Sequence, residues 1–149
     1  STAFVKAGDT RFDFTNVASL AGSTYCLPVG WAATPKLAPL VASGQIKVAS
    51  PNSISACAKL VALGRADYFV YGDIQVAYAL KSGDLPAGNI VMAKSEPLAL
   101  TPLYFIASKT VPGSAQLIES FNAGLKAIRK NGLYGKIVKA YSAMRPQLP

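Results

Sequence analysis

Residues 56–81, ACAKLVALGRADYFVYGDIQVAYALK, hold a helix, a strand and a second helix with a break between each pair. Three apolar residues of the first helix follow helical spacing: Leu60, Val61 and Leu63. Gly64 follows them, at the place where a helix ends through a left-handed residue. The uninterrupted apolar run at 68–71, YFVY, is typical of a strand that is buried on both faces. This stretch therefore predicts a layered α/β fold.

The second break marks a candidate binding position. Gly72 and Asp73 end the strand, and Asp73 can cap the following helix. The apolar residues of that helix also recur at helical spacing: Ile74, Ala77, Tyr78 and Leu80. Ligands of open α/β sheets bind at the carboxyl ends of the strands, so Tyr71, Gly72 and Asp73 are candidate site residues.

The same patterns extend along the rest of the chain. Strands are predicted at 3–6, 24–29, 45–49, 89–93 and 102–107, with helices at 34–42 and around Cys57 and a loop at 82–88. The predicted fold class is therefore α/β, with a mostly parallel sheet flanked by helices. Two helices close the chain, and each carries an apolar stripe: Leu117, Phe121, Leu125 and Ile128 in the first, and Leu133, Ile137, Tyr141 and Met144 in the second.

Composition narrows the range of functions. The chain has 149 residues, 51% of them hydrophobic, and a net charge of +8. The basic residues crowd the last quarter without interleaved aromatic residues, which favours a solvated basic face over a nucleic-acid site; a docking surface for an acidic partner or an anionic membrane is the alternative. With no His and only two Cys, we expect no metal site, no cofactor and no enzymatic activity. No apolar run approaches the roughly 18–20 residues that span a bilayer.

Several motifs, taken in order, resemble the extracellular solute-binding proteins of the amino-acid-binding family, which have the type II periplasmic binding fold. The most specific is Gly64-Arg65-Ala66-Asp67 between a helix and an apolar strand. Leu20-Ala21-Gly22 followed by the strand at 24–29 and Gly30 resembles the start of the family's second lobe. The remaining matches are Glu96-Pro97-Leu98, the segment 105–109, Phe121-Asn122 with Leu125, and Asn131-Gly132 with Ile137.

The resemblance implies a domain assignment. Residues 1–107 would form the second lobe, with hinge strands at about 3–6 and 102–108. Residues 108–149 would be the C-terminal helices that belong to the first lobe, whose N-terminal part has no counterpart in this sequence. That part supplies an aromatic clamp and an Arg for the ligand carboxylate in family members. We therefore expect a fragment or a rearranged product that self-associates through the apolar patch it exposes.

Carrying over the family's ligand positions gives three turns. The first is Gly30-Trp31-Ala32, where family members usually have small hydroxyl residues after the Gly. Trp31 either stacks on the ligand or packs at the lobe edge. The second turn is Ser50-Pro51-Asn52, which either contacts the ligand or only starts a helix.

The third turn is Tyr71-Gly72-Asp73. Amino-acid binders carry an Asp at the position of Gly72 that pairs with the ligand ammonium, whereas this chain has its Asp one residue later. Asp73 either binds the ligand or caps the helix that follows. A ligand without an α-amino group is therefore credible.

The oxidation state of the two cysteines depends on the compartment in which the protein works. Cys26 and Cys57 would be a buried, reduced pair in an intracellular protein, but an exported lobe would oxidise them if their Cα atoms came within about 7 Å. Cys26 lies in a strand and Cys57 in the helix after the adjacent strand, so we expect a disulfide.

The resemblance implies the solute-binding component of an ABC-type uptake system, working with the transporter's membrane subunits in the periplasm or outside the cell. Such a protein captures a small polar or anionic molecule in an interlobe cleft that closes by hinge motion. A ligand-sensing module of a signalling protein is the alternative. A dehydratase-like enzyme on the same fold is a weaker one, since too few acid and base groups lie near the cleft.

Overall fold

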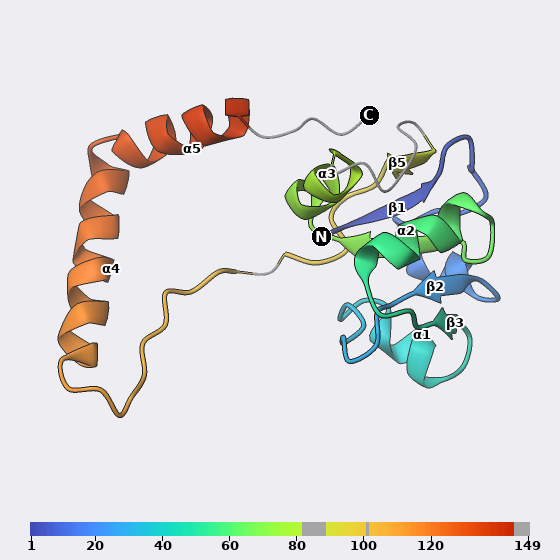
Figure 1. The fold of residues 1–149 in the computed structure, drawn as a ribbon, viewed down its shortest axis with the longest axis horizontal. Helices are drawn as coiled ribbons and strands as arrows, with labels where there is room; N and C mark the ends of the chain where they lie inside the picture. Colours follow the sequence, from blue (N-terminus) through green and yellow to red (C-terminus); the bar gives the residue numbers. More distant parts are fainter. Residues whose placement is uncertain (82–88, 101, 145–149) are drawn as a thin grey trace. The chain divides into compact units, whose positions relative to one another are not determined.

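The computed structural model describes residues 1–81, 89–100 and 102–144, so the predicted loop at 82–88 lies outside the described residues. Within them, residues 1–100 form one compact unit and residues 102–144 form another (Figure 1). The lobe assignment made above stays a prediction.

The first unit is built on one five-stranded sheet. Its strands are β1 (Thr2–Lys6), β2 (Thr24–Cys26), β3 (Lys47–Ala49), β4 (Tyr68–Tyr71) and β5 (Ile90–Met92), in the order β3-β2-β4-β1-β5. Strands β3 and β4 run parallel to β2, whereas β1 is antiparallel to both β4 and β5. Four strands therefore share one direction and β1 opposes them. The α/β class with a mostly parallel sheet is confirmed.

Alternating side chains give the sheet two buried faces. One face contains Ala3, Val5, Tyr25, Tyr68 and Val70, and the opposite face contains Phe4, Cys26, Phe69 and Ile90. This alternation follows from the two-residue period of a strand. The prediction that 68–71 is buried on both sides is confirmed, since three of its residues are buried and Tyr71 is half-buried.

Each face has its own cover. A short 3₁₀ helix, η1 (Val17–Leu20), and α1 (Ala38–Ala42) pack with Phe14 on the first face. The second face is covered by α2 (Ile54–Ala62) and α3 (Asp73–Lys81). Helix α2 contacts β1, β2, β4 and β5 (Figure 1).

Two predicted elements are shorter than expected. Strand β2 ends at Cys26 rather than at residue 29, because Pro28 has no N–H with which to continue the ladder. Helix α1 begins at Ala38 rather than at residue 34. The chain is already turning at Thr34, however, because the Thr34 carbonyl accepts hydrogen bonds from Leu37 N and Ala38 N, both at 2.9 Å.

Helix α2 ends as its sequence predicts. Gly64 has φ +69°, its N–H donates to Val61 O at 3.0 Å, and Arg65 N donates to Leu60 O at 2.8 Å. These two bonds form a Schellman motif. Leu63 is the C-cap, and it is exposed rather than part of the apolar face.

The apolar face of α3 differs from its predicted pattern in a similar way. Val76 and Ala77 are its buried residues, and Tyr78 is exposed. A phenol tolerates water better than an aliphatic side chain, because its hydroxyl group can remain solvated.

The second unit consists of α4 (Ser114–Lys130) and α5 (Leu133–Met144), which confirms the two predicted closing helices. The prediction of a strand at 102–107 is wrong, because this segment is irregular. A strand needs a partner for its N–H and C=O groups, and no strand of the described residues pairs with it. Its large apolar side chains are consequently exposed, among them Leu103, Tyr104 and Ile106.

None of the helices within the described residues is long and apolar enough to cross a membrane.

Candidate functional site

Strands β2, β3 and β4 run in the same direction, so their carboxyl ends meet at one edge of the sheet. The three predicted turns follow these ends. Leu27 N donates to Ala49 O at 3.0 Å and Val29 N donates to Pro51 O at 2.9 Å. These bonds tie the first turn to the second beyond the last residues of the ladder.

The first turn exposes apolar groups. Trp31 N donates to Pro28 O at 3.1 Å, and Gly30 adopts φ +79°, which favours glycine. Gly30, Trp31 and Ala32 are all exposed. The turn therefore offers an indole and a methyl group to its surroundings, and no side-chain hydroxyl.

Trp31 meets the third turn. Its ring centroid lies 5.0 Å from that of Tyr71, with 42° between the ring planes. This distance is within the range of attractive aromatic pairs. The contact joins residues forty positions apart in the chain, and it brings two of the predicted site residues together.

Helix α3 begins at Asp73, one residue earlier than the predicted start at Ile74. Gly72 O accepts the first helical hydrogen bond, from Val76 N at 3.0 Å, so Gly72 occupies the N-cap position and Asp73 is the first helical residue. A carboxylate in the first turn is stabilised by the helix dipole. A Cβ atom at Gly72 would collide with the side-chain amide of Gln75, so an acidic residue there would require Gln75 to move.

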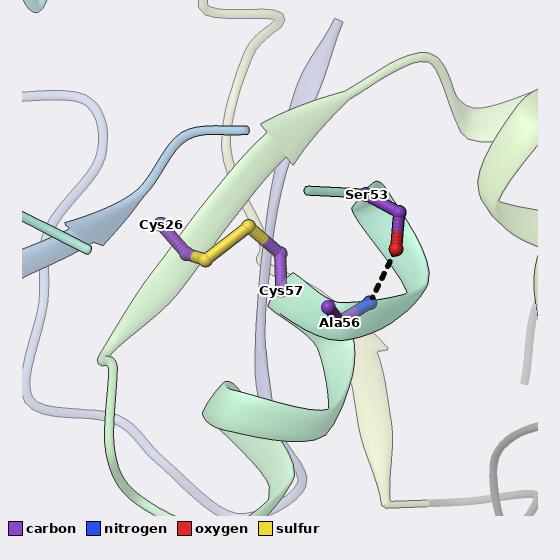
Figure 2. The surroundings of a disulfide bond; sticks show 4 residues. All are labelled: Cys26, Ser53, Ala56 and Cys57. Carbon is purple, nitrogen blue, oxygen red and sulfur yellow. Dashed lines mark hydrogen bonds between the residues drawn. A yellow bond between two sulfur atoms is a disulfide. The ribbon is translucent and has the colours of Figure 1, made fainter. Parts of the chain in front are cut away.

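The second turn leads into α2. Pro51 is half-buried, whereas Ser50 and Asn52 are exposed. Ser53, not one of these three residues, caps α2: its hydroxyl accepts from Ala56 N at 3.1 Å (Figure 2). This cap fixes the path of the turn beside the sheet edge.

The predicted disulfide between Cys26 and Cys57 is confirmed (Figure 2). It joins the last residue of β2 to α2 with the Cα atoms 5.5 Å apart, and both side chains are buried. Cys26 lies four residues before Gly30, and Cys57 lies five residues after Asn52. The cross-link thus fixes the supports of the first two turns relative to each other.

The acidic residue of the Gly-Arg-x-Asp motif has a structural role at the opposite edge of the sheet. Asp67 Oδ2 accepts from Thr24 N at 2.7 Å, at the start of β2. Arg11 Nη2 bridges Asp67 Oδ1 at 2.8 Å and Asp9 Oδ2 at 2.7 Å. The hydrogen bond from Arg11 holds the pKa of the Asp9 carboxyl below its usual value, and hydrogen bonds to Asp9 and Asp67 raise the pKa of Arg11.

The pKa values of two core tyrosines are also shifted. Burial raises the pKa of the Tyr68 phenol to about 12 and that of Tyr25 further. Their rings stack 5.4 Å apart. Both phenols therefore remain neutral at physiological pH, and they are packed in the core rather than at the candidate site.

Sequence reasoning missed Thr34. Its Oγ1 is buried and has no hydrogen-bond partner within the described residues, three positions after Trp31. Buried hydroxyls normally have a partner. The available signal was a threonine before a proline at a helix start, which marks a turn but does not reveal burial.

A hollow of about 330 Å³ lies elsewhere, beside β1 and β5, and Asp9, Phe12, Met92 and Lys94 are among the residues that line it. It includes none of the predicted site residues. In the part of the chain that the structure describes, no group of three or more His, Cys, Asp or Glu residues could hold a metal ion.

The fold has clear counterparts among solved structures. An ancestral arginine-binding protein bound to arginine matches with a TM-score of 0.62 and 22% identity, covering 93% of this chain and 58% of that one. The second substrate-binding domain assigned to an amino acid ABC transporter of Streptococcus pneumoniae gives a TM-score of 0.60 and 22% identity, covering 94% and 59%. A histidine kinase sensor domain similar to periplasmic binding proteins gives 0.58 and 18%, covering 98% and 59%.

No family model and no curated protein matches the chain. The shared structure therefore defines a fold: that of a lobe of the type II periplasmic binding proteins, the class in which amino-acid-binding solute receptors are found. The chain spans less than two thirds of the length of each of these three structures.

Proposed function

We propose that this chain is part of a solute-binding protein that captures a small polar molecule for an ABC-type uptake system. The observation that carries the proposal is the convergence of three turns at one sheet edge, where Val29 N–Pro51 O and the Trp31–Tyr71 ring contact join them. Ligands of open α/β sheets bind at this position. The proposed site residues are those of the three turns: Gly30, Trp31, Ala32, Ser50, Pro51, Asn52, Tyr71, Gly72 and Asp73.

The chemistry of these turns supports binding rather than catalysis. Asp73 is the one ionisable carboxylate among them, and neither His nor Cys is present. Acid and base catalysis needs groups within hydrogen-bond reach of a reacting atom, and usually more than one. The buried Cys26–Cys57 disulfide supports a compartment outside the cytoplasm, in the periplasm or beyond the cell.

The experiment is a thermal-shift screen of the full-length gene product after its bound small molecules have been removed by unfolding and refolding. The panel holds amino acids, organic cations, carboxylates and sugars. A cognate solute at about 100 times its Kd should stabilise the protein by about 2.7 kcal/mol, which is a rise of several degrees in Tm. Absence of any shift, together with absence of a small-molecule adduct in native mass spectrometry of the untreated protein, would contradict the proposal.

Free amino acids are expected to bind the 149-residue chain weakly or not at all. Gly72 stands at the position of the family's ammonium partner, and no first-lobe clamp is present in the sequence. Titration calorimetry against the common amino acids tests this expectation. A Kd near or below micromolar for any of them would contradict either the assignment of Gly72 to that position or the incompleteness of the site.

A sensor module is the second candidate, and the similarity to a histidine kinase sensor domain favours it. Cross-linking in cells separates the two. An uptake protein should be captured with a membrane permease, and a sensor with a signalling kinase.

A further inference from the structure

The hollow beside β1 and β5, called the β1–β5 hollow below, is separate from the three turns of the candidate site. Its volume of about 330 Å³ falls within the range of small-molecule sites in proteins. The residues that line it come from β1, from the loop that follows β1 and from the segment 91–94. All of them belong to the first unit, so the hollow is a feature of that unit alone.

Two phenylalanines give the hollow an aromatic wall. Phe14 is buried, and its ring meets the ring of Tyr68 edge-on with the centroids 5.1 Å apart. Phe12 is half-buried and contacts the same tyrosine with the centroids 6.0 Å apart. A core residue therefore holds both rings, and each ring still borders the hollow. Aromatic surface in such a position can pack against the apolar part of a ligand.

Strand β5, at the edge of the sheet, supplies further apolar surface. Val91 packs against the core cluster of the first face, whereas 45% of Met92 is exposed. A methionine side chain is flexible and polarisable, so it can adapt to apolar groups of different shapes. A mainly apolar lining with a few polar groups is typical of small-molecule sites.

The carboxylate in the lining, that of Asp9, is already paired. Its oxygens accept hydrogen bonds from the backbone N of Arg11 at 3.1 Å, from Arg11 Nε at 3.0 Å and from Arg11 Nη2 at 2.7 Å. The side-chain hydrogen bond from Arg11 lowers the pKa of Asp9, and the charge of Lys6 acts weakly in the same direction. Asp9 is therefore ionised at neutral pH, and Arg11 balances its charge.

Lys94 carries a positive charge that no described residue balances. It lines the hollow, it is exposed, and its ammonium group makes no ion pair within the described residues. The charged groups of the hollow and of the ion pairs beside it are those of Asp9, Asp67, Lys6, Arg11 and Lys94. Three are positive and two are negative, so one positive charge is in surplus. An ammonium group beside apolar surface matches a ligand with an apolar body and an anionic end.

We propose that the β1–β5 hollow is an accessory site for a small amphipathic carboxylate of the arylalkanoate class. The apolar body packs on Phe12, Phe14 and Met92, and the carboxylate pairs with Lys94. None of the residues of the three turns lines this hollow, so the inference stands apart from the proposed function.

The chain offers a built-in reporter for this site. It has two methionines, so isotope-labelled methionine methyl groups give two NMR signals, and a Met144→Leu variant assigns them. Met92 lines the hollow, whereas Met144 belongs to α5 of the second unit. One signal therefore reports on the proposed site, and the other is an internal control.

The probes are phenylpropionate, phenylpropionamide and phenylpropylammonium, which are similar in shape and differ in charge. Each is titrated into the 149-residue chain at neutral pH and equal ionic strength. Phenylpropionate should move the Met92 signal saturably and leave the Met144 signal in place. Its affinity should be at least about fivefold above that of the ammonium probe.

Lys94→Gln removes the charge and keeps most of the length of the side chain. It should lower the affinity for phenylpropionate about threefold, the size expected of one exposed charge pair, and leave that for phenylpropionamide unchanged. Lys47→Gln is the matched control, because Lys47 is an exposed lysine of β3, at the other edge of the sheet. The control should behave like the parent chain, and circular dichroism verifies that both variants fold.

Three results would overturn the inference. A Met92 signal that no probe moves at concentrations up to about 10 mM would reject the hollow as a binding site. Binding of the amide or the ammonium probe as tightly as phenylpropionate, or Lys94→Gln without effect, would reject the anionic ligand. Equal movement of the two methionine signals would assign the binding to exposed apolar surface in general. The three turns are tested separately, by the thermal-shift screen of the full-length product.

Discussion

The two compact units use their apolar residues in opposite ways. Residues 1–100 bury large side chains on both faces of a sheet, and a disulfide joins the sheet to α2. Between residues 102 and 143 no residue is buried, although α4 and α5 carry clear apolar stripes. The second unit also holds six of the 15 basic residues and one of the seven acidic ones. An amphipathic sequence pattern therefore predicts that a helix forms, but it does not predict the surface on which the apolar face of that helix packs.

The largest expected effect concerns the cross-link that only the first unit has. Replacing both Cys26 and Cys57 by Ala should lower the free energy of unfolding by about 3–4 kcal/mol, because thirty intervening residues become unconstrained in the unfolded chain. Urea unfolding with and without reductant measures it. The reductant should destabilise the parent chain and leave the double variant unchanged; equal sensitivity of both would contradict the account.

A matched pair of leucines compares the two units directly. Leu20 is fully buried in the first unit, whereas 52% of Leu117 on α4 is exposed. Leu20→Ala should cost about 3 kcal/mol through lost burial and a cavity. Leu117→Ala should change the free energy of unfolding by less than about 0.5 kcal/mol. Urea denaturation at one protein concentration gives both values, and equal losses would show that α4 is packed as tightly as the core.

Self-association should depend on the apolar stripe of the second unit. Phe121 is exposed on α4 and stacks on Phe105 with the ring centroids 4.3 Å apart. Phe121→Glu should weaken association about tenfold, measured by sedimentation velocity over a range of concentrations. Asn122→Glu is the control, because it places the same charge one residue further, on the polar side of the helix. A parent chain that is monomeric at all concentrations would contradict this prediction, because it requires self-association.

The smallest effect concerns the ion pairs at the amino edge of the sheet. Because the folded pKa of Asp9 is lowered, its contribution is present at neutral pH and is lost as the pH falls through that folded value, below about 4. Arg11 is 64% exposed, so Asp9→Asn should cost less than about 1 kcal/mol at pH 7. Urea unfolding at pH 7 and pH 3 should show this difference shrinking in acid. A constant difference would assign the effect to hydrogen bonding alone.

Local signals predicted the elements of the first unit well. The helix end at Gly64, the strand at 68–71 and the start of α2 depend on nearby residues, and the structure has them in place. The antiparallel insertion of β1 between β4 and β5 depends on the whole sheet and was not predicted. The prediction of a strand at 102–107 was wrong because pairing also depends on the whole sheet. Strand propensity cannot reveal whether a pairing partner exists.

The candidate site could also be predicted from the sequence only in part. Its three turns could be predicted, since each follows a readable strand. The contact of Trp31 with Tyr71 could not, because it joins turns separated by forty residues and depends on the order of the strands. The burial of Thr34 Oγ1 likewise required the folded chain.

The central claim is that Trp31 is a binding residue at the edge of the first unit rather than a packing residue. The most direct measurement compares Trp31→Ala with the parent in the full-length product, by native mass spectrometry of the co-purified solute and by thermal unfolding after the solute is removed. We predict that the fraction of molecules carrying the solute adduct falls sharply, in keeping with a loss of about 1–3 kcal/mol of binding energy, while the Tm of the solute-free protein moves by less than about 2 °C. Full occupancy with a strongly lowered Tm would contradict the claim.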